Sequence, residues 1–326
     1  MSHDVDAMAA AALTGLIDRA ETSPVHRRRD LLAAGISDAL HVAMIRRGDI
    51  VRLRHGVYAA RAVVDSADAA ERHRFDIAAA AAGAREPVWA FGSSAALLHG
   101  LPLPFAVPER ISLVRASGAD ERALRRPSRH RLTLPDLHVT TGPVDPASTV
   151  IVRGVPAVPP ALAALSTATE LTSSRWRTAL LDGALWRGAT VDEIAELIDL
   201  WRHVGHRADL LEALSRARPG SQTVLETFSR LAFLEGGLPE PILQHPFYDS
   251  EGLIGYVDMW WPSLNVIGEA DGLIKYASRH DVVREKRRED RLRALGPRVV
   301  RWTFEDIETH PELVIASIRR ASQLAS

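Results

Sequence analysis

The sequence predicts a multidomain α+β protein, and three observations lead to that prediction. The chain has 326 residues, which is the length of two or three ordinary domains. Three helical segments and two short β-like runs open it, and a succession of helix, three strands, helix and strand closes it. The stretch between them has mixed α/β character and is mostly helical. We therefore expect domains over residues 1–62, 63–218 and 219–326.

Composition limits the classes of partner and chemistry. The chain is 46% hydrophobic and 25% charged, as in soluble globular proteins. Its formal net charge of -1 creates no overall field toward nucleic acid or membrane, so such a partner requires a local patch. There is no cysteine, which excludes disulfides and thiolate metal sites.

The opening segment, MSHDVDAMAAAALTGLI, has two early aspartates and no basic region, so we expect no secretory signal. No apolar run has the length that a bilayer requires. We expect a cytoplasmic protein without a membrane partner.

The first 60 residues have the pattern of a winged helix-turn-helix. Helices are expected over residues 8–20, 26–35 and 37–48, with Ser37 as an N-cap and Gly48 as a terminator. Two β-like runs, IVRLR and GVYAA, then join through His55–Gly56. Three helices followed by a small hairpin are typical of this DNA-binding module.

Basic side chains concentrate at the helix ends and hairpin of this segment. In a winged helix these places face phosphates, although solvated helix ends would give the same pattern. The candidate DNA-binding residues of the segment are Arg28, Arg29, His41, Arg46, Arg47, Arg52 and Arg54.

The string DLLAAGIS…MIRRGDIVRLRHGVYA resembles the winged-helix head of AbiEi-type antitoxins. The resemblance covers about a fifth of the chain. It implies DNA binding, often as autorepression of a toxin–antitoxin operon, with a cognate toxin as partner. The later segment GSSAALLHGL resembles the linker region behind the same head.

The middle region offers no catalytic motif. We expect a helix over 67–84, strands at ISLVR and HVTTG, and two or three helices after residue 167. His99 ends an apolar run and is expected to cap or pack, and Ser93 and Ser94 are expected to form an N-cap pair. The region is expected to be a spacer or a protein-contact domain.

The last third predicts an αβββαβ core. Its helix (221–237, capped by Ser221) precedes strand-like runs PILQHPFYD, GYVDMWWP and LNVIGEADG, then a charged helix (278–296), the strand PRVVRWTFEDI and a closing helix. This order is that of the restriction-endonuclease-like fold.

Acidic residues end two of these strands. Asp258 lies near the end of one, and Glu269 and Asp271 are two residues apart on the next, so both point to one face. Three neighbouring acids are costly without a cation. Carboxylate oxygens suit Mg²⁺ or Mn²⁺, and such an ion serves phosphodiester hydrolysis. The alternative is a solvated strand end.

Lys275 follows these acids. Lys275 and Lys286 are the only lysines among 40 Lys and Arg residues. A lysine retained in an arginine-rich background indicates a need for a compact ammonium group with a shiftable pKa, or chance survival on a solvated face. Lys275 is the candidate group that activates water.

The strings GYVDMWWP…IGEADGLIKY…RREDRLRALG…VVRWTFEDI resemble the PD-(D/E)XK nucleases, closest to the very-short-patch-repair (Vsr)-like branch. The resemblance implies that Asp258 and Glu269 hold the metal. Asp271 stands where the superfamily's E-x-K lysine would be, a departure that the Vsr-like branch shares, and Lys275 is a candidate replacement for that lysine.

Glu226 matches an auxiliary helix acid of some members of the superfamily. Helical angles, however, place Glu226 away from the apolar stripe of its helix, where an i,i+4 pair with Arg230 is the alternative. On the later charged helix, Arg284, Arg287 and Arg288 are candidate phosphate contacts, or parts of a solvated face.

Two functions follow as expectations. The first is a Mg²⁺-dependent DNA endonuclease, in which a cut through both strands would imply a homodimer. The second is a non-catalytic antitoxin-type repressor whose nuclease-like domain only binds.

Overall fold

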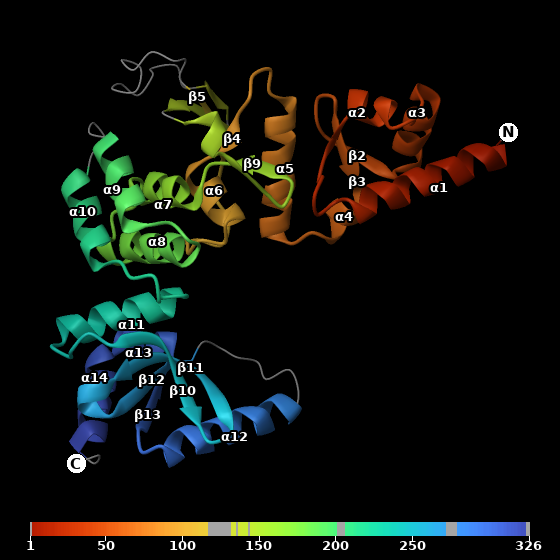
Figure 1. The fold of residues 1–326 in the computed structure, drawn as a ribbon. Coiled ribbons are helices and arrows are strands. Elements are labelled where there is room, and N and C mark those ends of the chain that lie inside the picture. Colours follow the sequence, from red (N-terminus) through yellow and green to blue (C-terminus); the bar gives the residue numbers. More distant parts are fainter. Residues whose placement is uncertain are drawn as a thin grey trace. The chain divides into compact units, whose positions relative to one another are not determined.

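The computed structural model describes residues 2–116, 132–134, 136–142, 144–200, 206–271 and 279–323. The chain forms two compact units, Met1–Thr172 with Ala189–Leu214 and Ser173–Gly188 with Ser215–Ser326. Both mix helices and strands, and the strands of the described residues form three sheets (Figure 1). No helix within the described residues is long and apolar enough to cross a membrane.

The first unit begins with a small helical bundle and a three-stranded antiparallel sheet of order β1-β3-β2. As predicted, the Ser37 hydroxyl accepts a hydrogen bond from the Leu40 N–H, and Gly48 ends the third helix at φ 81°. Met44 and Ile50 are buried in the core of this part. Its elements are α1 (Ser2–Asp18), β1 (His26–Arg27), α2 (Arg28–Ala33), α3 (Asp38–Arg47), β2 (Ile50–Arg54), β3 (Val57–Ala60) and α4 (Arg61–Ser66).

A six-stranded sheet of order β6-β7-β5-β4-β9-β8 follows in the same unit. The two predicted strands are present as β5 and β7, while the others are too short, at two or three residues, to show a periodic pattern. The elements are α5 (Ala69–Gly83), β4 (Trp89–Ala90), α6 (Gly92–Leu98), β5 (Ile111–Ala116), β6 (Leu132–Leu134), β7 (Leu137–Gly142), β8 (Val150–Val152), β9 (Val155–Ala157), α7 (Pro160–Ala168), α9 (Val191–Leu200) and α10 (Arg207–Arg216).

The β8–β9 turn ties the two parts of this unit together. Arg153 binds Glu21 with Nε–Oε1 at 2.5 Å and also pairs with Glu71 of α5. Gly154 has a φ of 78°, and a Cβ there would lie 2.4 Å from the carbonyl oxygen of Thr22. Only glycine fits such a close backbone approach.

The second unit is built on a four-stranded sheet of order β10-β11-β12-β13. The first three strands are antiparallel, and β12 and β13 are parallel. The elements are α8 (Ser174–Trp186), α11 (Val224–Glu235), β10 (Ile242–Asp249), β11 (Gly252–Trp261), β12 (Val266–Ala270), α12 (Arg279–Ala294), β13 (Arg298–Trp302), α13 (Phe304–Thr309) and α14 (Pro311–Gln323).

The start of α11 and the end of β13 differ from those predicted. Thr223, not Ser221, caps α11, because its hydroxyl accepts the Glu226 N–H. The last strand ends at Trp302, because Thr303 and Asp306 form a capping box that starts α13. Two tryptophans lie in the core of the unit. A Cβ on Gly268 would lie 2.6 Å from Trp302 and 2.8 Å from Trp261, so these rings need a glycine at that position.

Helix α8 lies in the second unit although its residues fall within the stretch expected to form the middle domain. Asp182 of α8 and Arg230 of α11 form an ion pair at 2.8 Å, with side chains 1% and 0% exposed. The Thr227 hydroxyl and the Arg218 N–H also donate to Asp182. The sequence alone does not indicate this ion pair, because Asp182 and Arg230 are 48 residues apart.

Candidate active site

Strands β11 and β12 separate at Asp258. Their residue pairing ends at Met259–Gly268, so Asp258 and Glu269 would be the next pair in register. The Asp258 carboxylate accepts a hydrogen bond from the Ala270 N–H at 2.8 Å. A side chain thus takes the place of a backbone partner, and the sheet opens beside the predicted acids.

Gln244 of β10 is a site residue that sequence reasoning missed. It lies between the pairs Leu243–Met259 and His245–Val257, opposite Asp258. Its φ is 49°, a left-handed conformation that is costly for a residue with a Cβ and typical of functional sites. Its amide nitrogen lies 3.4 Å from carboxylate oxygens of both Asp258 and Glu226.

Glu226 is buried beside this group. Its carboxylate accepts hydrogen bonds from the Gln222 N–H at 2.8 Å and the Thr223 hydroxyl at 3.0 Å. Burial raises the pKa of Glu226 to about 7, and the charge of Asp258 adds to the shift. The alternative pair with Arg230 does not form, because Arg230 pairs with Asp182. Helical angles placed Glu226 off the apolar stripe, but helix α11 is buried on that side too.

Glu269 is held by Arg288 of α12. The Arg288 guanidinium donates to the Glu269 carboxylate at 3.0 Å and to the Tyr256 carbonyl at 2.7 Å, and it also binds Glu285. Burial nevertheless raises the pKa of Glu269 to about 7, with Asp258 opposing ionisation and Arg288 favouring it. Burial also raises the pKa of Asp258.

Asp271 and Lys275 complete the predicted set. The Asp271 N–H donates to the Trp302 carbonyl at 2.8 Å, and the Asp271 side chain is half-buried. Its charge adds to the pKa shift of Asp258, which places it in the same electrostatic group. Lys275 lies outside the described residues, so its expected role stays a prediction.

The oxygens of this site suit a hard cation such as Mg²⁺ in their chemistry. Buried carboxyls with raised pKa values also indicate charges that lack compensation. As the side chains lie, however, no three acidic or histidine groups among the described residues are gathered closely enough to hold a metal ion. Asp258 is turned to Ala270 and Glu269 to Arg288, so a cation would have to exchange with these partners.

The basic candidates of α12 differ in exposure. Arg284 and Arg287 are exposed, whereas Arg288 is half-buried and contacts Glu269. Arg301 of β13 pairs with Glu285 and Glu289 of α12 and fixes this helix against the sheet. Arg291 pairs with Asp249 of β10 at 2.5 Å.

The basic candidates of the first unit also divide. Arg46 and Arg52 are exposed and have no ion-pair partner among the described residues. Arg28, Arg29 and Arg47 are exposed and pair with aspartates. Arg54 is half-buried and bound to Asp136 at 2.5 Å. His41 is 4% exposed and packs edge-on against Tyr58, so in this structure it is a core residue.

The middle region contains one serine–histidine pair that the sequence did not reveal. Ser94 does not cap a helix but lies inside α6, where its hydroxyl is 3.1 Å from His73 Nε2. Burial lowers the pKa of His73 to about 4, which keeps the ring neutral. Ser94 is fully buried and accepts the Ser112 N–H, so the pair is structural.

His99 packs as predicted, with Nε2 2.8 Å from the Val158 carbonyl oxygen.

No family profile matches the chain. It is similar to Uncharacterized protein MT2308 of Mycobacterium tuberculosis (strain CDC 1551 / Oshkosh), with 29% identity over 109 residues. It is similar to the same extent to Uncharacterized protein Rv2248 of Mycobacterium tuberculosis (strain ATCC 25618 / H37Rv). The matched segment covers 33% of this chain and 40% of each relative.

Proposed function

We propose that this protein is a DNA-binding, metal-dependent endonuclease whose active site is the acidic group of β11, β12 and α11. The observation that carries the proposal is the opening of the sheet at Asp258, with Glu226 and Glu269 beside it. Glu226 is buried and Glu269 is half-buried, and the loss of solvent raises the pKa of each to about 7. Perturbed acids of this kind, grouped where a sheet opens, are candidates for a functional site.

The order of elements supports a nuclease core of the PD-(D/E)XK type. Helix α11, three antiparallel strands, α12 and a parallel β13 follow one another in the second unit. Asp258 and Glu269 are then the ligands of Mg²⁺ or Mn²⁺, with Asp271 beside them. A bound ion would polarise a phosphate and lower the pKa of a water molecule.

The other residues of the site orient these acids. Gln244 joins Asp258 to Glu226 through its amide, and the Ala270 N–H fixes the Asp258 carboxylate. Arg288 holds Glu269 and, when released, has a guanidinium suited to a DNA phosphate. Exposed Arg284 and Arg287 on the same helix would extend that contact.

We propose that the N-terminal segment binds DNA as a winged helix. Helix α3 exposes Val42, Ile45 and Arg46 on its outer face. Apolar side chains can contact thymine methyl groups in the major groove, and Arg46 can reach a base or a phosphate. Arg52 of the β2–β3 hairpin adds an exposed charge.

The test is cleavage of supercoiled plasmid with Mg²⁺ or Mn²⁺, with EDTA as a blank. Wild type should nick or linearise the plasmid, and Glu269→Ala should not. Glu305→Gln removes an exposed acid elsewhere in the same unit and should cut like wild type. If wild type binds DNA but leaves every substrate intact with either ion, the nuclease proposal is wrong.

A second candidate function is transcriptional repression by a chain whose nuclease-like unit does not cut. The pairing of Glu269 with Arg288 favours it, because an arginine already neutralises the acid that a metal would need. The aspartate at position 271, in place of a lysine, points the same way. Sequence-specific DNA binding with no cleavage would support this candidate.

A further inference from the structure

The first unit contains a cleft of about 540 Å³, whereas the acidic site belongs to the second unit. It is lined by side chains of the β2–β3 turn, helix α5, the loop before β4, and strands β5 and β7. This volume is in the range of sites that bind small organic molecules. Nothing in the proposed nuclease or repressor chemistry uses it.

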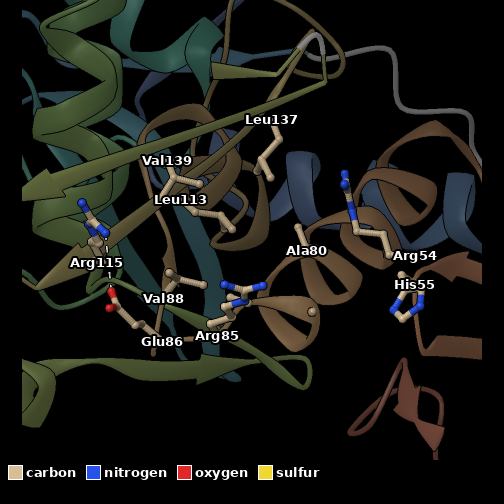
Figure 2. Close-up of a pocket in the computed structure, with 12 residues that line it drawn as sticks. Arg54, His55, Ala80, Arg85, Glu86, Val88, Leu113, Arg115, Leu137 and Val139 are labelled. Atoms are coloured by element: carbon tan, nitrogen blue, oxygen red, sulfur yellow. Dashed lines mark hydrogen bonds and ion pairs between the residues drawn. The ribbon is translucent and has the colours of Figure 1, made fainter. Parts of the chain in front are cut away.

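One part of the cleft is apolar. Leu113 and Val139 are paired neighbours on β5 and β7, and Leu137 lies two residues before Val139, so all three face the same side of the sheet. Val88 and Ala80 also line this part (Figure 2). A hydrated phosphate or a DNA backbone would leave such a surface uncovered, whereas a flat apolar body would fill it.

The rest of the lining is mainly cationic. Arg54 is the last residue of β2, His55 belongs to the turn that follows it, Arg85 to the loop after α5, and Arg115 to β5 (Figure 2). Glu86 is the only acid among the lining residues, and it lies 3.4 Å from Arg115. Arg85 is exposed and has no ion-pair partner among the described residues.

We propose that this cleft binds a small organic anion, a carboxylate or phosphate monoester carried on a flat apolar body. The anion is held by Arg85 with help from Arg115 and Arg54, and the body lies against Leu113, Leu137 and Val139. Arginine suits this role because its planar guanidinium donates two parallel hydrogen bonds to either anion.

Occupancy of the cleft is coupled to the N-terminal segment. Arg54 already forms an ion pair with Asp136, the residue before β7, and a bound anion would compete with Asp136 for it. The same turn carries Gly56, whose carbonyl accepts the N–H of Arg28 at the start of α2. This coupling rests on the proposed DNA-binding role of that segment, while ligand binding itself does not.

The test uses the full chain and 1-naphthyl phosphate as the probe, with 2-naphthoate and inorganic phosphate in parallel. Calorimetry should show one saturable site for the probe and much weaker binding of inorganic phosphate, which lacks the apolar body. The 2-naphthoate arm decides between carboxylate and phosphate. Arg85→Glu should weaken probe binding at least about tenfold, because a charge-assisted contact becomes a repulsion.

Two controls make the result specific. Arg110→Glu makes the same charge change at an exposed position outside the cleft and should bind the probe within about twofold of wild type. Methyl NMR spectra should show shifts at Val88, Leu113, Leu137 and Val139. Absent binding, equal affinity of Arg85→Glu and wild type, or shifts confined to other methyl groups would overturn the proposal.

The coupling has its own readout. Saturating probe should change the DNA affinity of wild type at least about threefold and leave that of Arg85→Glu unchanged. If the probe binds in the cleft but DNA affinity stays constant, the effector role is wrong while the site stands. If the chain binds no DNA at all, the proposed function fails and the site still stands.

Discussion

Two groups of charges in the second unit, one buried and one half-buried, are built differently. Asp182 is met by Arg230, the Thr227 hydroxyl and the Arg218 N–H, so its oxygens have the partners that a buried carboxylate needs. Asp258 has one backbone donor and one long contact to Gln244, and Glu269 has one arginine. Asp182 is fully buried and has three donors, whereas Asp258 and Glu269 are half-buried and have fewer.

The difference separates a role in folding from a role in function. A buried ion pair with all its hydrogen bonds fixes one helix against another. Burial raises the pKa of Asp182 as well, so the number of hydrogen-bond partners, and not the pKa alone, separates the two groups. Acids that burial leaves with few partners cost stability at neutral pH, and such acids are candidates for a functional role. Glu226 and Glu269 are of this second kind.

The largest effect is expected at Asp182. Asp182→Ala leaves the Arg230 guanidinium buried and unpaired, so we expect a loss of about 3–5 kcal/mol in the unfolding free energy of the second unit. Urea unfolding followed by tryptophan fluorescence measures it, since five of the seven tryptophans lie in this unit. Asp182→Leu combined with Arg230→Met should recover most of the loss. A change below about 1 kcal/mol for Asp182→Ala would refute the structural role.

His73 of the first unit should make folding stability fall as the pH falls, which is opposite to the effect of an acid with a raised pKa. Its pKa is about 4 when folded and 6.5 unfolded, so the unfolded chain binds more protons between these values. Acidification from pH 7 to 4.5 should therefore cost on the order of 2–3 kcal/mol of stability relative to His73→Gln. Denaturation at both pH values checks this, and a parallel loss in wild type and variant contradicts it.

Glu226 should destabilise the second unit as pH rises. Its pKa is about 7 when folded and 4.5 unfolded, so the stability that its neutral form contributes is lost between these values. Glu226→Gln should therefore be near wild type in stability at pH 5 and about 1–3 kcal/mol more stable at pH 8. Urea unfolding at the two pH values provides the measurement. A variant that is less stable at pH 8 would place Glu226 with the structural acids.

Gln244 gives the smallest expected effect. Gln244→Ala and Gln244→Gly both remove the amide, but only glycine adopts a φ of 49° without cost. The glycine variant should be about 1 kcal/mol more stable than the alanine variant, as measured by urea unfolding. Equal stability would mean that the left-handed conformation stores no strain.

The sequence predicted many of the helices and strands because their signals lie within short stretches of neighbouring residues. Capping and termination signals located α3, and strand-like runs separated by a charged helix located β10 to β13. The α8–α11 pairing and Gln244 escaped prediction because they depend on contacts between distant residues and on one backbone angle. The separation of β11 from β12 at Asp258 likewise requires the three-dimensional structure. Glu226 was named from a resemblance, against its helical angle, and lies beside Asp258.

Mn²⁺ titration by calorimetry at pH 8 tests the central claim most directly, because it needs no knowledge of the DNA substrate. Wild type should bind the ion at the site of Asp258 and Glu269. Glu269→Gln should weaken that binding at least about tenfold, through the loss of a charged oxygen ligand, while Glu305→Gln should not. Identical titrations for wild type and Glu269→Gln would contradict the account.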